Sequence, residues 1–107
     1  MIKHFKRIGR LNNLDPAPIS ERGMKLMEEA GELAKEINRT TGRKKGTHPT
    51  KEVRHDLLSE AADTIQCVFS IIHQFNEENK FNAPEITYQE LEDKVGVKND
   101  KWVNSLD

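Results

Sequence analysis

Three features of the sequence predict an all-α fold. Two long stretches repeat apolar residues at the i, i+3, i+4 and i+7 spacing of an amphipathic helix, and a capping-box pattern precedes a third candidate helix. No run of alternating apolar and polar residues indicates a β-strand. The 107 residues, 1–107, have the length of one domain, and only 35% of them are hydrophobic. We therefore expect a small helical bundle whose core is completed by oligomerisation.

The first long helix is predicted at about residues 20–39. Ser20 is a suitable N-cap, and Ile19 and Met24 are spaced as a hydrophobic staple across the helix start. Gly42 follows as a terminator. The buried face should be the stripe of apolar residues formed by Leu26, Met27, Ala30, Leu33, Ala34 and Ile37.

A second long helix is expected at about residues 51–79, after a basic loop at 40–50. Thr50 can cap it, and its apolar positions recur at helical spacing. Between Thr64 and Phe75 it carries no Asp, Glu, Lys or Arg on any side. One small chain has too few helices to cover such a stretch, so we expect it to form a subunit interface.

The two ends of the chain are predicted to be helical over shorter lengths. Thr87 and Glu90 are spaced as a capping box for a short helix that ends at Gly96, so that residues 85–107 form this helix and a tail. Near the other end, a short helix with three apolar residues facing inward is expected from Ile2, Phe5 and Ile8.

Charge is nearly balanced in sum but segregated along the chain. The chain has 17 Lys and Arg and 18 Asp and Glu, for a net charge of -1, which disfavours a generic nucleic-acid or membrane-surface binder. Residues 1–12 and 39–51 carry basic residues and no acids, whereas acids dominate residues 20–38 and 52–79. The mean hydropathy is -0.79, and no apolar run is long enough to span a bilayer. Because MIKHFKRIGR also lacks the apolar segment of a signal peptide, we expect a cytoplasmic protein with no membrane partner.

Two groups of acids lie on the two long helices. Helical periodicity puts Glu28, Glu29 and Glu32 on one face of the first helix. On the second helix, Asp56, Glu60 and Asp63 share a face in the same way. Acids on one face repel one another, and neither group has enough basic neighbours to neutralise it. One interpretation is two solvated helix faces. The other is a cation site, for which carboxylate oxygens without Cys or His select Mg²⁺, with Mn²⁺ as the second choice.

The spacing of these acids resembles a known enzyme family. Glu28-Glu29-Ala30-Gly31-Glu32, followed by Glu60-Ala61-Ala62-Asp63, is similar to the EExxE and ExxD motifs of the MazG-like all-α nucleoside triphosphate pyrophosphohydrolases. The surrounding segments KLMEEAGELAKEI and LLSEAADTIQCVFSII resemble the two motif helices of that family. The resemblance implies Mg²⁺-dependent hydrolysis of an NTP or dNTP to the monophosphate and pyrophosphate, in a nucleotide-pool (house-cleaning) role. It also implies a homodimer or a tetramer made of two dimers.

The resemblance also implies roles for individual residues. Metal ligands would be Glu29, Glu32, Glu60 and Asp63, and Glu28 would orient or deprotonate the attacking water. Substrate phosphates need cations and hydrogen-bond donors. Candidates lie in the basic loop, at the start of the second helix and in the C-terminal tail: Lys44, Lys45, Lys51, Arg54, Asn99 and Lys101. Trp102 is a candidate for stacking on the base.

Two other functions are compatible with the same residues. The first is a non-catalytic helical adaptor that dimerises through the uncharged helix and binds basic partners on its acidic faces. The second is a nucleic-acid binder that uses the basic loop and the N-terminus, although the net charge gives no reason to expect a stable nucleic-acid partner. We expect His73 to be a packed or interface histidine and Cys67 to be a small core residue.

Overall fold

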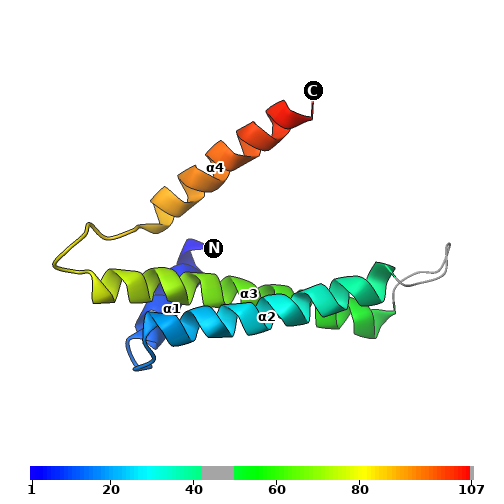
Figure 1. Ribbon diagram of the computed structural model, residues 1–107, viewed down its shortest axis with the longest axis horizontal. Helices are drawn as coiled ribbons and strands as arrows, with labels where there is room; N and C mark the ends of the chain where they lie inside the picture. Colours follow the sequence, from blue (N-terminus) through cyan, green and yellow to red (C-terminus); the bar gives the residue numbers. More distant parts are fainter. Residues whose placement is uncertain (42–49, 107) are drawn as a thin grey trace.

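The computed structural model describes residues 1–41 and 50–106, and this part of the chain forms four helices and no strand. They are α1 (Ile2–Asn12), α2 (Ile19–Thr41), α3 (Lys51–Glu78) and α4 (Tyr88–Ser105). Helices α2 and α3 lie side by side and antiparallel, α1 crosses α3 near its C-terminal end, and α4 points away from the other three (Figure 1). The predicted all-α class is confirmed.

Helix α1 is held on α3 by a small aromatic cluster. The ring of Phe5, only 6% exposed, meets Phe69 edge-on at 5.2 Å and lies 4.2 Å from the His73 ring, centroid to centroid. The Nε2 atom of His73 is 2.7 Å from the carbonyl oxygen of Phe5. Gly9 lies against the same imidazole so closely that a Cβ there would come within 2.6 Å of the ring. His73 is therefore a packed residue, as expected, and Gly9 is required by the close approach of the two helices.

Helix α2 begins at Ile19, one residue before the predicted N-cap Ser20. The reason is tertiary, because the backbone N–H of Ile19 donates to Glu78 Oε2 of α3 at 2.9 Å. The carbonyl of Pro18 accepts hydrogen bonds from the N–H groups of Glu21 and Arg22. Met24 is 70% exposed, so the expected staple with Ile19 buries little of this side chain.

The buried face of α2 matches the predicted apolar stripe only in part. Its buried residues are Arg22, Glu29 and Glu36, which recur every seven positions and so lie on one side of the helix. Met27 is 76% exposed and Ile37 is 48% exposed. Leu26 and Leu33 of the predicted stripe are partly buried. The prediction is wrong for the other four members in a single chain, because polar residues take the most buried positions of α2 while these four are exposed: Met27, Ala30, Ala34 and Ile37.

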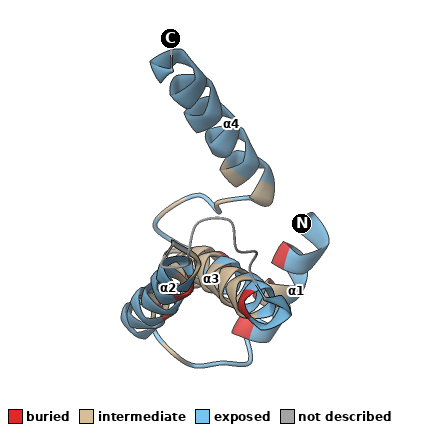
Figure 2. Cartoon of the chain, turned by 90° about the vertical axis from the view of Figure 1, so that its right-hand side faces the viewer, coloured by how far each residue is buried: buried red, intermediate tan, exposed pale blue. Residues whose placement is uncertain are grey.

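Helix α3 begins and ends close to the predicted residues. Thr50 is its N-cap, as predicted, and its hydroxyl accepts from the N–H of Val53 at 3.2 Å. Within the uncharged stretch Phe69 is 5% exposed, but Ile65 is 42% exposed. The stretch is thus only partly covered within one chain (Figure 2).

Helix α4 has the predicted capping box of Thr87 and Glu90 but does not end at Gly96. It continues to Ser105, because Gly96 has no left-handed backbone conformation that would stop the helix. Every described residue after Leu91 is exposed, and the helix projects away from the other three helices (Figure 2). None of the helices in the described ranges is both long enough and apolar enough to cross a membrane.

Candidate metal centre

The middle of the α2 and α3 pair brings three carboxylates together. Glu29 from α2 and Glu60 and Asp63 from α3 each offer one oxygen, and these atoms all lie within 4.8 Å of one another. Glu29 is only 9% exposed, while Glu60 and Asp63 are partly buried. Of the five acids named as catalytic from the sequence, three form this acidic triad.

Glu60 is the least satisfied member of the acidic triad. Its Oε2 atom is buried and has no hydrogen-bond partner among the described residues. The pKa of Glu60 is raised mainly by the adjacent Glu29 carboxyl. A protonated Glu60 can donate a hydrogen bond to Glu29, which favours the protonated form of Glu60. Burial and the charges of Asp63 and Glu32 raise the pKa further. A buried oxygen that repels its neighbours is stabilised by a cation.

Lys25 is the cation that already touches the acidic triad. Its Nζ lies 3.0 Å from Glu29 Oε1 and 3.7 Å from Glu28 Oε2. The hydrogen bond from Lys25 lowers the pKa of Glu29, and the bond to Glu29 raises the pKa of Lys25. The expectation that the α2 acids lack a basic partner is therefore wrong for Glu29 and Glu28, because Lys25 is one turn earlier on the same helix.

Glu32 and Asp56 occupy different surroundings from the acidic triad. Glu32 is exposed on α2, near enough for its charge to raise the pKa of Glu60. Asp56 is paired with Arg39, whose Nη1 lies 3.0 Å from Asp56 Oδ2 and 2.7 Å from Glu36 Oε2. The predicted acidic strip of α3 is thus divided: Asp56 is neutralised across the helix pair, and Glu60 and Asp63 are left together.

The chemistry of the acidic triad suits a hard divalent cation. Three carboxylates supply oxygen ligands only, which is the donor set that Mg²⁺ and Mn²⁺ prefer. The unpartnered Glu60 Oε2 is an atom that a cation at this position would satisfy. The residues present therefore fit the metal that the motif spacing implied.

Those predicted phosphate-binding residues that the structure describes are not gathered at the acidic triad within one chain. Lys44 and Lys45 lie outside the described residues. Lys51 and Arg54 are exposed at the start of α3, and the helical period turns Arg54 roughly 120° away from Glu60. Asn99, Lys101 and Trp102 are all exposed on the projecting half of α4, where Trp102 is 67% exposed.

Beside the acidic triad is a cavity of about 440 Å³ between α1, α2 and α3. We call it the α1–α3 cavity, and residues that line it include Asn12, Arg22, Lys25, Cys67 and Ser70. Sequence reasoning did not identify Asn12, Arg22 or Lys25 as site residues. The only signal was for Lys25, which precedes Glu29 by four positions on one helix face.

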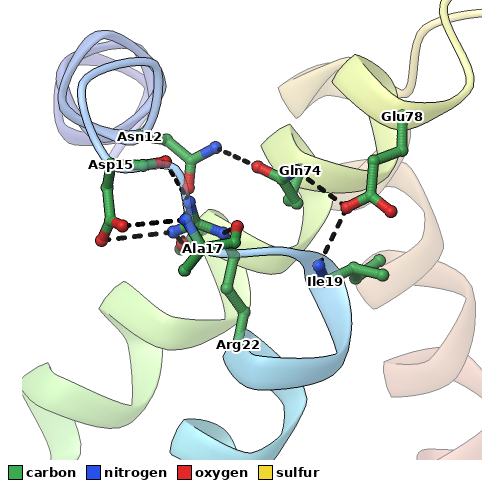
Figure 3. A network of polar contacts seen from close by, with 8 residues as sticks. Asn12, Asp15, Ala17, Ile19, Arg22, Gln74 and Glu78 are labelled. Atoms are coloured by element: carbon green, nitrogen blue, oxygen red, sulfur yellow. Dashed lines mark hydrogen bonds and ion pairs between the residues drawn. The ribbon is translucent and has the colours of Figure 1, made fainter.

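A network of hydrogen bonds holds the polar wall of the α1–α3 cavity in place. Arg22 donates to the Asp15 carbonyl at 2.7 Å and the Ala17 carbonyl at 2.9 Å (Figure 3). It also donates to Ser70 Oγ at 2.9 Å. Ser70 donates to Asn12 Oδ1 at 2.7 Å. Through these bonds Arg22 ties the loop between α1 and α2 to α3.

Comparison with known proteins yields no relative: no family model, no curated protein and no solved structure matches this chain.

Proposed function

We propose that this protein is an Mg²⁺-dependent nucleoside triphosphate pyrophosphohydrolase of the MazG-like kind. The observation that carries the proposal is the convergence of Glu29, Glu60 and Asp63 with a buried, unpartnered Glu60 oxygen. The same three residues belong to the motifs through which the sequence resembles that family. The reaction is cleavage of an NTP or dNTP between the α and β phosphates, as a house-cleaning activity in the cytoplasm.

The carboxylates have separate roles in this proposal. Glu29, Glu60 and Asp63, with Glu32 at the exposed side, hold Mg²⁺, and Mn²⁺ can replace it. When bound, the metal lowers the pKa of a water and neutralises charge on the phosphates. Glu28, which is exposed beside Lys25, orients or deprotonates the attacking water. The acids alone would repel a triphosphate, so the cation is needed for substrate to approach.

Turnover of a substrate panel tests the proposal. Common and modified NTPs and dNTPs are incubated with the protein and Mg²⁺, and both pyrophosphate and the monophosphate are measured. We expect stoichiometric release of both products from at least one substrate, and loss of release in Glu29→Gln and Glu60→Gln. Glu52→Gln is the matched control, because Glu52 is an exposed acid on α3 outside the acidic triad. Absence of turnover across the whole panel would refute the proposal.

The same experiment separates the two alternative functions. An adaptor would show no turnover and would bind basic partners through the acidic faces. A nucleic-acid binder would show steeply salt-dependent affinity for DNA or RNA that persists in Glu29→Gln.

A homo-oligomer, either a dimer or a tetramer of two dimers, is part of the proposal. Apolar residues that α2 and α3 direct outward support it, since Met24, Met27, Leu58 and Ile65 are between 42% and 76% exposed. None of the larger described side chains is fully buried, so one chain by itself encloses little core. Packing of these faces against a second copy would cover them.

A further inference from the structure

We propose that the α1–α3 cavity binds the nucleoside part of the substrate, with Lys25 at the junction between this cavity and the acidic triad. The inference rests on the proposed function, because it takes the acidic triad as the place where the phosphates and metal meet. It identifies the part of the protein that recognises the base and sugar of the substrate.

The position of the cavity is the first argument. Lys25 both lines the cavity and binds Glu29 at 3.0 Å, and Cys67 lines the cavity one turn after Asp63. Cavity and acidic triad thus share a boundary. A molecule with phosphates at the acidic triad has its uncharged end directed into this cavity or into solvent. At about 440 Å³ the cavity falls within the roughly 300–1,000 Å³ of small-molecule sites.

The lining is the second argument. Asn12 and Arg22 are polar side chains only 5% and 8% exposed, and both are held by hydrogen bonds before any ligand arrives. Ile8, Leu11 and Ala17 supply apolar surface to the same cavity. A few fixed polar groups on an otherwise apolar wall are typical of sites that recognise a ring by its edge. No aromatic residue is among the described residues that line the cavity, so the base would be held by its edge and by aliphatic contacts.

Lys25 is the third argument, because it connects the two halves of the site. Its ammonium is bound to Glu29, which is also a proposed metal ligand. A divalent ion on Glu29 competes with Lys25 for the same carboxylate and releases the ammonium. The released ammonium lies at the cavity boundary, where it can bind a substrate phosphate. Lys25 therefore supplies the cation that Lys51 and Arg54 do not bring to the acidic triad within one chain.

Chemical protection of Cys67 tests the cavity directly, because it is the only cysteine of the chain and lines the cavity. The full-length protein is treated with methyl methanethiosulfonate, and the modification rate is followed by intact mass. Each reaction contains Mn²⁺ and either a member of a panel of α,β-methylene nucleoside triphosphates, which resist cleavage at that bond, or tripolyphosphate. Cys67→Ser confirms that the added mass is on Cys67.

We expect at least one α,β-methylene nucleotide to slow the modification about tenfold at a concentration near ten times its dissociation constant, as mass action requires. Tripolyphosphate, which has the phosphates but no nucleoside, should leave the rate unchanged. Equal protection by tripolyphosphate, or protection by no nucleotide of the panel, would overturn the inference.

A substitution that fills the cavity gives the second readout. Gln66 is exposed and lines the cavity, so Gln66→Trp narrows it without opening the core. We expect KM to rise at least about tenfold with little change in kcat and in Mn²⁺ affinity, since the loss is of nucleoside contacts. Gln89→Trp on α4 is the matched control. An unchanged KM in Gln66→Trp contradicts the assignment.

The two proposals fail separately. If triphosphates are turned over but neither Cys67 nor Gln66→Trp responds, the enzyme stands and the cavity assignment falls. If no triphosphate is turned over but nucleotides protect Cys67 and tripolyphosphate does not, the cavity binds nucleotides and the hydrolase proposal falls.

Discussion

Glu29 and Glu60 face each other across α2 and α3 with carboxylate oxygens within 4.8 Å, and Glu60 Oε2 is buried without a hydrogen-bond partner in the described part of the chain. Lys25 neutralises Glu29 from the α2 side, which lowers the pKa of Glu29. Proximity to Glu29, followed by burial, raises the pKa of Glu60. The fold thus holds one carboxylate that a basic residue stabilises beside one whose buried Oε2 has no hydrogen-bond partner among the described residues.

Glu60→Gln should stabilise the metal-free protein near neutral pH. A carboxyl whose pKa is raised by folding costs stability when it ionises, and this cost grows as pH rises from the ordinary glutamate range through the raised pKa of Glu60. Gln removes the charge and so removes the cost. Thermal unfolding without divalent ions should give a higher Tm for Glu60→Gln at neutral pH, and the difference should vanish in acid, where Glu60 is protonated in both states.

The same variant should lose the stabilisation that divalent ions confer. Mg²⁺ or Mn²⁺ should raise the Tm of the original protein and of the control Glu52→Gln, because a ligand that binds only the folded state stabilises it. It should leave the Tm of Glu60→Gln nearly unchanged. If Glu60→Gln is less stable than the original protein without metal, the acidic triad is not an unsatisfied site.

Mn²⁺ affinity should fall as pH decreases, beginning at a higher pH than for ordinary carboxylates. Protons compete with the metal for Glu60, and the raised pKa of Glu60 moves this competition toward neutral pH. Titration calorimetry at several pH values measures the effect, and it should disappear in Glu60→Gln, where residual binding is weak at all pH values. Affinity that is constant down to the ordinary glutamate range would contradict the prediction.

Gly9→Ala should destabilise the protein although alanine favours helices. The added Cβ would lie 2.6 Å from His73 Cε1, and the His73 ring cannot move freely because it is hydrogen-bonded to the Phe5 carbonyl. We expect a loss of about 1–3 kcal/mol of unfolding free energy, as for overpacked cores. Gly23→Ala is the matched control, because a Cβ added there would meet nothing within 4 Å. This variant should gain about 0.5–1 kcal/mol of unfolding free energy.

A double-mutant cycle identifies the cause of the Gly9→Ala effect. In a His73→Ala background the ring is gone, so Gly9→Ala should cost little or become stabilising. Urea denaturation of the four proteins supplies the coupling energy. An equal cost in both backgrounds would show that the helix contact at Gly9 involves other atoms.

Ile65→Asp should dissociate the proposed oligomer. Ile65 is 42% exposed near the start of the uncharged stretch of α3, and an interface there would bury the new charge without a partner. Light scattering after size-exclusion chromatography should report a smaller mass for Ile65→Asp. Ser59→Asp, an exposed position on α3 before the uncharged stretch, should keep the mass of the original protein. A monomeric original protein would contradict the oligomer.

Local signals in the sequence predicted the helices well. Thr50 and Thr87 cap their helices as expected, because each needs only a side-chain oxygen and the next turn of its own backbone. The predicted end of α4 at Gly96 is wrong, because a glycine of this kind ends a helix where its backbone is left-handed. Gly96 has no such conformation, and α4 continues through it. The start of α2 was missed by one residue, because its first N–H is bound by the distant Glu78.

What the sequence by itself determined is the all-α class and the two groups of acids, each on one face of a helix, both of which follow from the period of a helix. Only the tertiary structure decided which acids meet. It brought Glu29 close to Glu60 and Asp63, and it paired Asp56 with Arg39 in a salt bridge. It also buried three polar side chains of α2, those of Arg22, Glu29 and Glu36. The physical reason is that helical spacing relates residues within one helix, whereas contact between helices depends on how each helix is rotated and packed against its neighbour.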